Sequence, residues 1–108
     1  MATLRGVLGQ VFPGASTLTD IYTVPASKNA VFKVIASNTV TTPQTFRVSI
    51  ALNGDPDNLK QYIAYDVPML GSDTGSTVTV TAQTGAVIRV QSLLGSVAFT
   101  VTGLEQDE

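Results

Sequence analysis

The stretch from residue 53 to residue 58 gathers several side-chain oxygens and reads Asn53-Gly54-Asp55-Pro56-Asp57-Asn58. Calcium takes about six to eight oxygen ligands, and loops rich in aspartate and asparagine often supply them. The spacing here differs from that of an EF-hand, which needs a glycine at its sixth position and a glutamate at its twelfth. Position twelve counted from Asn53 is Ala64. A polar turn built around Gly54 and Pro56 explains the same residues, so we predict no metal site here.

A second motif, Asp73-Thr74-Gly75-Ser76, resembles the signature of aspartic proteases, in which two aspartates share one proton. In those enzymes the signature follows the end of an apolar strand, whereas Gly71 and Ser72 precede it here. The 35 residues after Asp73 are too few to build the flap and the substrate-binding strands. A turn that leads into a strand over residues 77–82 accounts for the motif, and we predict no catalytic role for Asp73.

The chain contains neither cysteine nor histidine. Disulfides, thiolate metal sites and cysteine nucleophiles are therefore excluded, and the commonest general base and metal ligand is missing. The serines also lack the Gly-x-Ser-x-Gly turn that exposes a nucleophile. We accordingly predict no catalytic, cofactor-binding or metal-binding residue, and no enzymatic activity.

Two tyrosines, Tyr62 and Tyr65, flank Ile63 and Ala64 and precede Asp66. Packing on a sheet is the simplest interpretation of this pattern. A contact surface is the alternative, because tyrosine is enriched at the centre of protein interfaces. Stacking of a carbohydrate on these rings is a third hypothesis, which the absence of tryptophan weakens.

Charge is sparse, at 13% of residues against about 25% in an average soluble domain. Such a surface is typical of a protein that other molecules cover. The basic residues do not form the cluster that nucleic-acid binding requires; they are Arg5, Lys28, Lys33, Arg47, Lys60 and Arg89. No apolar run approaches the roughly 18 residues that span a bilayer. We expect neither nucleic acid nor membrane as a partner.

The elements that would position these residues are β-strands. Apolar and polar residues alternate with a period of two, which is the pattern of a half-buried strand. We predict strands over residues 18–24, 30–36, 46–52, 60–66, 77–81, 86–92 and 97–102. Valine and threonine dominate them, and β-branched side chains favour a pleated sheet. No sustained helical stripe is present, although residues 59–64 also fit a single helical turn.

Turn residues separate the strands, with Gly54, Pro56 and Gly85 at the clearest positions. Short strands about 8–12 residues apart indicate a sandwich or barrel. We predict one all-β domain over residues 1–108, an antiparallel β-sandwich or jelly roll of about seven to eight strands.

The two ends of the chain differ from this body. Residues 1–12 are apolar but interrupted by Gly6 and Gly9, so they form either the first strand or an N-terminal arm that docks on a neighbouring subunit. Residues 1–15 hold no apolar stretch long enough for a signal peptide, which favours mature sequence. Residues 105–108 include Glu105, Asp107 and Glu108, and we predict a disordered acidic tail.

Several segments together resemble small virion structural proteins of tailed bacteriophages. They are Ala2-Thr3-Leu4-Arg5-Gly6-Val7-Leu8-Gly9-Gln10, Leu18-Thr19-Asp20-Ile21-Tyr22-Thr23-Val24-Pro25-Ala26, Phe46-Arg47-Val48, Lys60-Gln61-Tyr62-Ile63-Ala64-Tyr65-Asp66 and Phe99-Thr100-Val101-Thr102-Gly103-Leu104-Glu105. The likeness covers most of the chain. It includes no shared catalytic motif, so no site residue is transferred.

This resemblance implies a capsid decoration or cement protein that is present in many copies on the virion, after assembly in the host cytoplasm. Its partners would be the major capsid protein or other virion proteins. A homo-oligomer is expected, and such proteins often form trimers. A neck, tail or baseplate component is the alternative, and a carbohydrate- or ligand-binding β-module is a third hypothesis.

Overall fold

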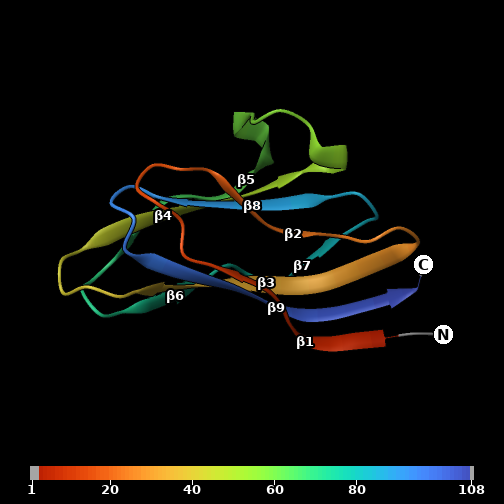
Figure 1. The fold of residues 1–108 in the computed structure, drawn as a ribbon, viewed down its shortest axis with the longest axis horizontal. Helices are drawn as coiled ribbons and strands as arrows, with labels where there is room; N and C mark the ends of the chain where they lie inside the picture. The colour runs from red at the N-terminus through yellow and green to blue at the C-terminus, as the bar shows by residue number, and fades with distance from the viewer. Residues whose placement is uncertain (1–2, 108) are drawn as a thin grey trace.

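The alternating apolar and polar residues form nine β-strands and no α-helix within residues 3–107, the part of the chain that the computed structural model describes (Figure 1). The predicted all-β fold of antiparallel sheets is therefore confirmed. The strands are β1 (Thr3–Val11), β2 (Thr19–Thr23), β3 (Lys28–Asn38), β4 (Gln44–Ala51), β5 (Tyr62–Met69), β6 (Thr74–Ser76), β7 (Val80–Ala82), β8 (Val87–Ser92) and β9 (Val97–Asp107). Two 3₁₀ turns, η1 (Leu52–Gly54) and η2 (Leu59–Gln61), lie between β4 and β5.

The strands form two layers. One sheet has the order β1-β9-β3, with β6 and β7 both pairing with the far side of β3, and the other has the order β2-β8-β4-β5. The two short strands pair with successive parts of β3 and act as two halves of one strand. The chain crosses to the other sheet at each connection apart from those between β4 and β5 and between β6 and β7. Two four-stranded sheets interleaved in this way make a jelly roll.

The division between β6 and β7 explains why there are nine strands rather than the predicted seven to eight. Thr77 both donates its backbone N–H to the carbonyl of Val34 and accepts the N–H of Val34 on its hydroxyl. The hydroxyl thus takes the place of a backbone partner, and residues 77–79 leave the ladder. The predicted strand over residues 77–81 is wrong at its start, because Val78 is 75% exposed instead of facing the core.

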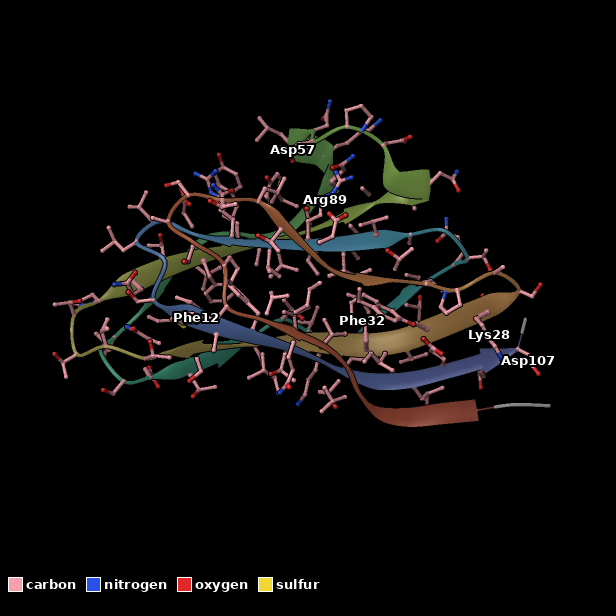
Figure 2. All side chains as sticks on the ribbon, in the orientation of Figure 1. Phe12, Lys28, Phe32, Asp57, Arg89 and Asp107 are labelled. Carbon is pink, nitrogen blue, oxygen red and sulfur yellow. The ribbon has the colours of Figure 1, made fainter. Side chains whose placement is uncertain are left out.

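The core lies between the two sheets, where Figure 2 shows Phe32 pointing from one layer toward the other. The largest fully buried side chains include Phe32, Phe46, Phe99 and Ile88. Phe46 of β4 meets Phe99 of β9 edge to face, with ring centroids 6.2 Å apart. This pair comes from different sheets, so it holds the layers together directly.

The N-terminal residues form a strand rather than a free arm. β1 pairs with β9 from Thr3 to Val11, with an irregularity between Val7 and Gly9. A Cβ atom at Gly9 would lie 2.3 Å from the carbonyl oxygen of Ile21, so glycine is what lets β1 approach β2 there. Met1 and Ala2 lie outside the described residues.

The predicted disordered tail at residues 105–108 is wrong for the residues that the structure describes. β9 continues to Asp107, and Glu105 is buried, at 9% exposure. The hydroxyl of Tyr22 donates a hydrogen bond to the Glu105 carboxylate, and Lys28 forms an ion pair with Asp107. These partners on β2 and β3 order the acidic residues, which sequence reasoning treated as solvated. Glu108 lies outside the described residues.

Candidate functional site

The exposed face of the sheet β2-β8-β4-β5 carries two arginine–aspartate pairs that project from adjacent strands. Arg47 on β4 pairs with Asp66, and Arg89 on β8 pairs with Asp20. In the ladder, Arg47 is opposite Gln91 and Arg89 is opposite Ser49. The residues next to the arginines, Val48 and Val90, face the core, so both arginines project from the outer side of the sheet.

A bulge in β5 brings its side chains to Arg47. Phe46 pairs with Val67 and Val48 pairs with Ala64, so Arg47 faces both Tyr65 and Asp66. Asp66 has a φ of 52°, in the left-handed region. A bulge of this kind redirects side chains and bends an edge strand. Here it places two consecutive residues on the outer face of the sheet.

The guanidinium of Arg47 is held from two directions. Its Nε and Nη2 atoms donate to the two carboxylate oxygens of Asp66, at 2.6 Å and 3.1 Å. Its Cζ atom lies 4.1 Å from the ring centroid of Tyr65, in cation–π contact. The hydrogen bonds from Arg47 lower the pKa of Asp66 below its ordinary value, so the carboxylate is charged at neutral pH. On so exposed a pair these contacts orient the guanidinium more than they stabilise the fold.

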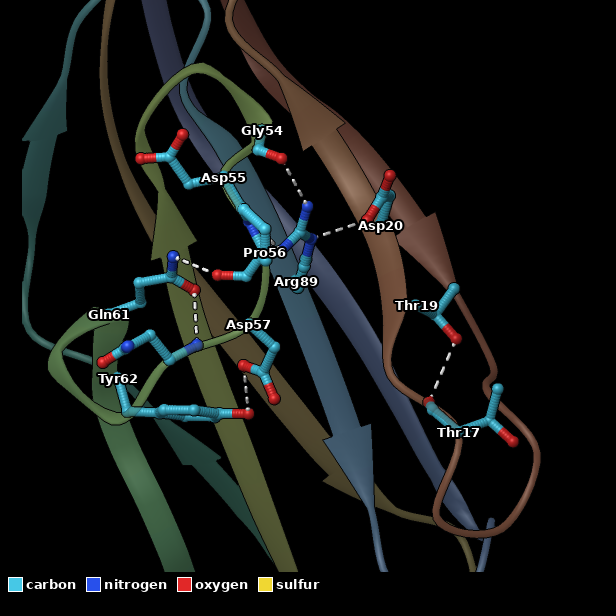
Figure 3. Close-up of polar contacts among 11 residues, drawn as sticks. Thr17, Thr19, Asp20, Gly54, Asp55, Pro56, Asp57, Gln61, Tyr62 and Arg89 are labelled. Carbon is cyan, nitrogen blue, oxygen red and sulfur yellow. Dashed lines mark hydrogen bonds and ion pairs between the residues drawn. The ribbon is translucent and has the colours of Figure 1, made fainter.

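The other arginine anchors the loop between β4 and β5 over the same face (Figure 3). The two terminal nitrogens of Arg89 donate to the carbonyl oxygens of Asp55 and Gly54, at 2.8 Å and 3.3 Å. The Asp57 carboxylate accepts a hydrogen bond from the Tyr62 hydroxyl at 2.9 Å. One half of the face is therefore covered by this loop, and the half around Arg47 is open.

The open half is a cleft of about 360 Å³ lined by Ser16, Thr45, Arg47, Asp66, Gln91, Ser92 and Leu93. Its outer wall is the loop between β1 and β2. The backbone N–H of Ser16 donates to the carbonyl of Ser92 at 2.8 Å, and the hydroxyl of Ser16 donates to the carbonyl of Leu93 at 3.2 Å. These bonds fix the wall against the end of β8.

A smaller apolar cleft of about 150 Å³ continues from this one, because both include Thr45 and Leu93. It is lined by Pro43, Gln44, Thr45, Pro68, Leu93 and Leu94. The loops at this end of the molecule expose large apolar side chains: Phe12 is 60% exposed, Leu70 71%, Leu93 61% and Leu94 58%. We call these four residues the apolar end.

The two tyrosines that the sequence singled out are partly exposed but do not form a shared platform. Tyr62 and Tyr65 meet edge to face, with centroids 5.1 Å apart and planes at 88°. The guanidinium of Arg47 covers one face of Tyr65. The rings act as supports of Arg47 and of the Asp57 loop, an arrangement unlike a flat stacking surface for a sugar.

The oxygen-rich loop has internal partners for its polar groups. The Asn58 side chain accepts the N–H of Lys60 as part of a capping box, and the carbonyls of Gly54 and Asp55 accept from the Arg89 guanidinium. The Arg89 guanidinium thus occupies carbonyl oxygens that a metal cation would otherwise use as ligands. Among residues 3–107, no three acidic side chains come together as a metal site.

The protease-like motif is part of the sheet edge. Thr74, Gly75 and Ser76 form β6 against β3, and the Asp73 carboxylate accepts the N–H of Thr74 at 2.8 Å. Gly75 packs next to the ring of Phe46, where a Cβ would lie 3.3 Å from the ring. Close packing against the core therefore accounts for this glycine.

Sequence reasoning did not single out Arg47 or Asp66 as a pair. The available signal is the adjacent Tyr65 and Asp66, two residues suited to an exposed face at consecutive positions, where a regular strand would alternate. Such a break in the period of two indicates a bulge.

No family model matches the sequence, and a search of curated proteins finds no relative. Within the described part of the chain, no helix has the length and apolar character needed to cross a membrane.

Proposed function

We propose that this chain is a non-enzymatic structural protein of a bacteriophage particle, a decoration or cement protein that binds the head lattice through protein–protein contacts. The observation that carries the proposal is the apolar end. Four large apolar side chains, each more than half exposed, lie on three loops at one end of the jelly roll.

Scattered exposed apolar residues are ordinary, but a cluster marks an interaction site. Phe12 follows β1, Leu70 follows β5, and Leu93 and Leu94 follow β8, so the loops of both sheets contribute. Gln44 pairs with Met69 and Phe46 pairs with Ser92, so the ends of β5 and β8 lie beside the same part of β4. Val11 pairs with Phe99, whose ring contacts Phe46, which places the end of β1 on the same side. Burying this surface against a partner removes apolar area from water, at about 25 cal/mol per Å² before the costs of association.

The jelly-roll fold is consistent with the proposal. Jelly rolls occur in viral capsid and lectin domains, and a fold by itself does not assign a function. Repetition on a lattice would add avidity to contacts that are weak individually. A homotrimer would present three apolar ends to the lattice. Native mass spectrometry of the purified protein measures the number of subunits in the oligomer.

The first experiment is quantitative mass spectrometry of particles purified from the phage or prophage that encodes the chain. A copy number close to that of the major capsid protein supports decoration or cement. A handful of copies moves the protein to the neck, tail or baseplate. Absence from the particles contradicts the virion proposal.

A double variant of the apolar end and a control variant elsewhere on the surface test this contact. Leu70→Ser changes an apolar side chain of this cluster, whereas Val78→Ser changes one that is 75% exposed elsewhere on the surface. We expect at least a tenfold loss of attachment to particles that lack the protein for Leu70→Ser combined with Leu94→Ser, and no loss for Val78→Ser. Equal attachment of all variants would exclude the apolar end as the contact.

A further inference from the structure

We infer that the two joined clefts on the outer face of β4 bind an extended peptide segment of a partner, with an apolar side chain and an asparagine or glutamine two positions apart. The inference rests on the proposed function and identifies the chemistry of the partner segment. It depends on two features of the clefts: their spacing along β4 and the hydrogen-bonding groups on their floor.

The spacing follows from the strand beneath the clefts. Thr45 and Arg47 are two residues apart on the same face of β4, which places them about 7 Å apart along the strand. Around Thr45 the walls are apolar, and around Arg47 they are polar. An extended peptide has the same repeat, since its alternate side chains are also about 7 Å apart. A peptide lying along β4 would therefore place one side chain in each part.

The apolar part suits an aliphatic side chain or a proline. Pro43, Pro68, Leu93 and Leu94 supply its walls, and its volume is about 150 Å³. Thr45 is opposite Pro68 in the ladder, so the strand itself holds this proline in place. The two leucines are more than half exposed, and a side chain inserted between them would take both out of water.

The polar part suits a carboxamide. Arg47 uses Nε and Nη2 on Asp66, which leaves Nη1 without a hydrogen-bond partner among residues 3–107. The side-chain amide of Gln91, which lines the cleft, makes no hydrogen bond within the same residues. An asparagine or glutamine oxygen can accept from Arg47 and Gln91 while its amide donates to the charged carboxylate of Asp66. A carboxylate in the same place would face the negative charge of Asp66, so the neutral carboxamide fits better.

The test uses the full 108-residue chain, immobilised, and a library of displayed random linear dodecapeptides as the probe. We expect enriched peptides to share an apolar residue and an asparagine or glutamine two positions apart. The synthetic consensus peptide should bind at least tenfold more weakly after Leu93→Ser or Arg47→Ala in the protein. Lys33→Ala, a change of an exposed cation on the opposite sheet, should leave its affinity unchanged.

A double-mutant cycle between Arg47→Ala and replacement of the peptide carboxamide by alanine measures whether the two groups touch. Non-additive losses support the proposed contact, and additive losses overturn it. No shared consensus, or a preference for glycans on an array with no peptide bound, also overturns the inference. Particle attachment of the intact protein is measured separately: a chain that attaches to particles but selects no peptides retains the proposed function and loses this inference.

Discussion

The hydroxyl of Tyr22 on β2 donates a hydrogen bond to the carboxylate of Glu105 on β9, so one polar contact ties the two sheets together. Both side chains belong to buried residues, each 9% exposed. Burial, and then the hydrogen bond to Glu105, raise the pKa of Tyr22 well above its ordinary value of about 10. The phenol therefore keeps its proton in the folded protein under conditions in which an unfolded chain would lose it.

Stability should consequently fall at high pH because of Tyr22. The contribution is complete below the unfolded pKa near 10 and is lost as the pH rises toward the higher folded pKa. We expect the free energy of unfolding to decrease above about pH 10 by up to about 1.4 kcal/mol per pH unit from this group. Urea denaturation at pH 9, 10 and 11 measures the slope.

The matched variant is Tyr22→Phe, which removes the ionisable group and keeps the ring. It should be less stable at neutral pH by about 1–3 kcal/mol, because the buried Glu105 loses its donor. Its stability should also decline less steeply above pH 10. Identical slopes in the two proteins would show that Tyr22 does not titrate in this way.

The aromatic pair of Phe46 and Phe99 joins the two layers by direct side-chain contact, which we expect to matter for stability. Phe99 is 1% exposed, so Phe99→Ala should lower the free energy of unfolding by about 3–5 kcal/mol through lost burial and a new cavity. Val78→Ala, at an exposed position, should change it by less than about 0.5 kcal/mol. Thermal unfolding followed by circular dichroism compares the two, and similar midpoints would contradict the position of the core.

Strand β1 illustrates how an edge element gains order from its neighbours. It pairs with β9 along its length. Leu8 and Val11 are partly buried and pack against the core. Its backbone fits closely against β2 at Gly9. A segment tied in this way is part of the domain, even though its composition also suited a docking arm.

Deletion of residues 2–10 should therefore destabilise the domain, because it exposes the edge of β9 and removes Leu8 from the core. We expect a lower unfolding midpoint and weaker β-type circular dichroism than in the intact chain. A deleted protein with an unchanged midpoint would restore the arm interpretation, in which the segment serves only attachment. Its attachment to particles would then be the next measurement.

The jelly roll joins strands that are distant in the sequence, since β1 lies beside β9 and β2 beside β8. Folding must close long loops before these pairings stabilise it, and proteins of this kind fold slowly. We expect refolding over milliseconds to seconds. Stopped-flow tyrosine fluorescence measures the rate, because the chain has no tryptophan. Refolding within microseconds would contradict the non-local topology.

The first and last described residues, Thr3 and Asp107, lie at one end of the molecule, while the apolar end lies at the other (Figure 1). Thr3 pairs with Gln106 at one end of the ladder, and Val11 pairs with Phe99 near the apolar end. If the apolar end contacts the particle, a small folded protein fused after Glu108 should not weaken attachment. A fusion in the loop between Leu94 and Gly95 should abolish it, and the reverse result would place the contact at the termini.

The sequence by itself determined the fold class, most strand positions and the turn at Gly85, where the N–H of Ala86 donates to the carbonyl of Gln83. A tight hairpin, which these turn residues also predict, is wrong, because β7 and β8 lie in different sheets. These features depend on local alternation and on turn chemistry, which neighbouring residues specify. The same reasoning failed at Val78 and at Glu105. The partners that decide those positions, Val34 and Tyr22, are distant in the chain.

The apolar end and the cleft beside Arg47 were decided only by the tertiary structure. Phe12, Leu70 and Leu93 are far apart in the sequence, and they lie at the same end of the molecule because the jelly roll brings three loops there. Arg47 and Asp66 meet because a bulge redirects β5. Local patterns specify which residues face outward. Which outward residues become neighbours depends on strand order, and strand order is set by long-range pairing and core packing that no single segment encodes.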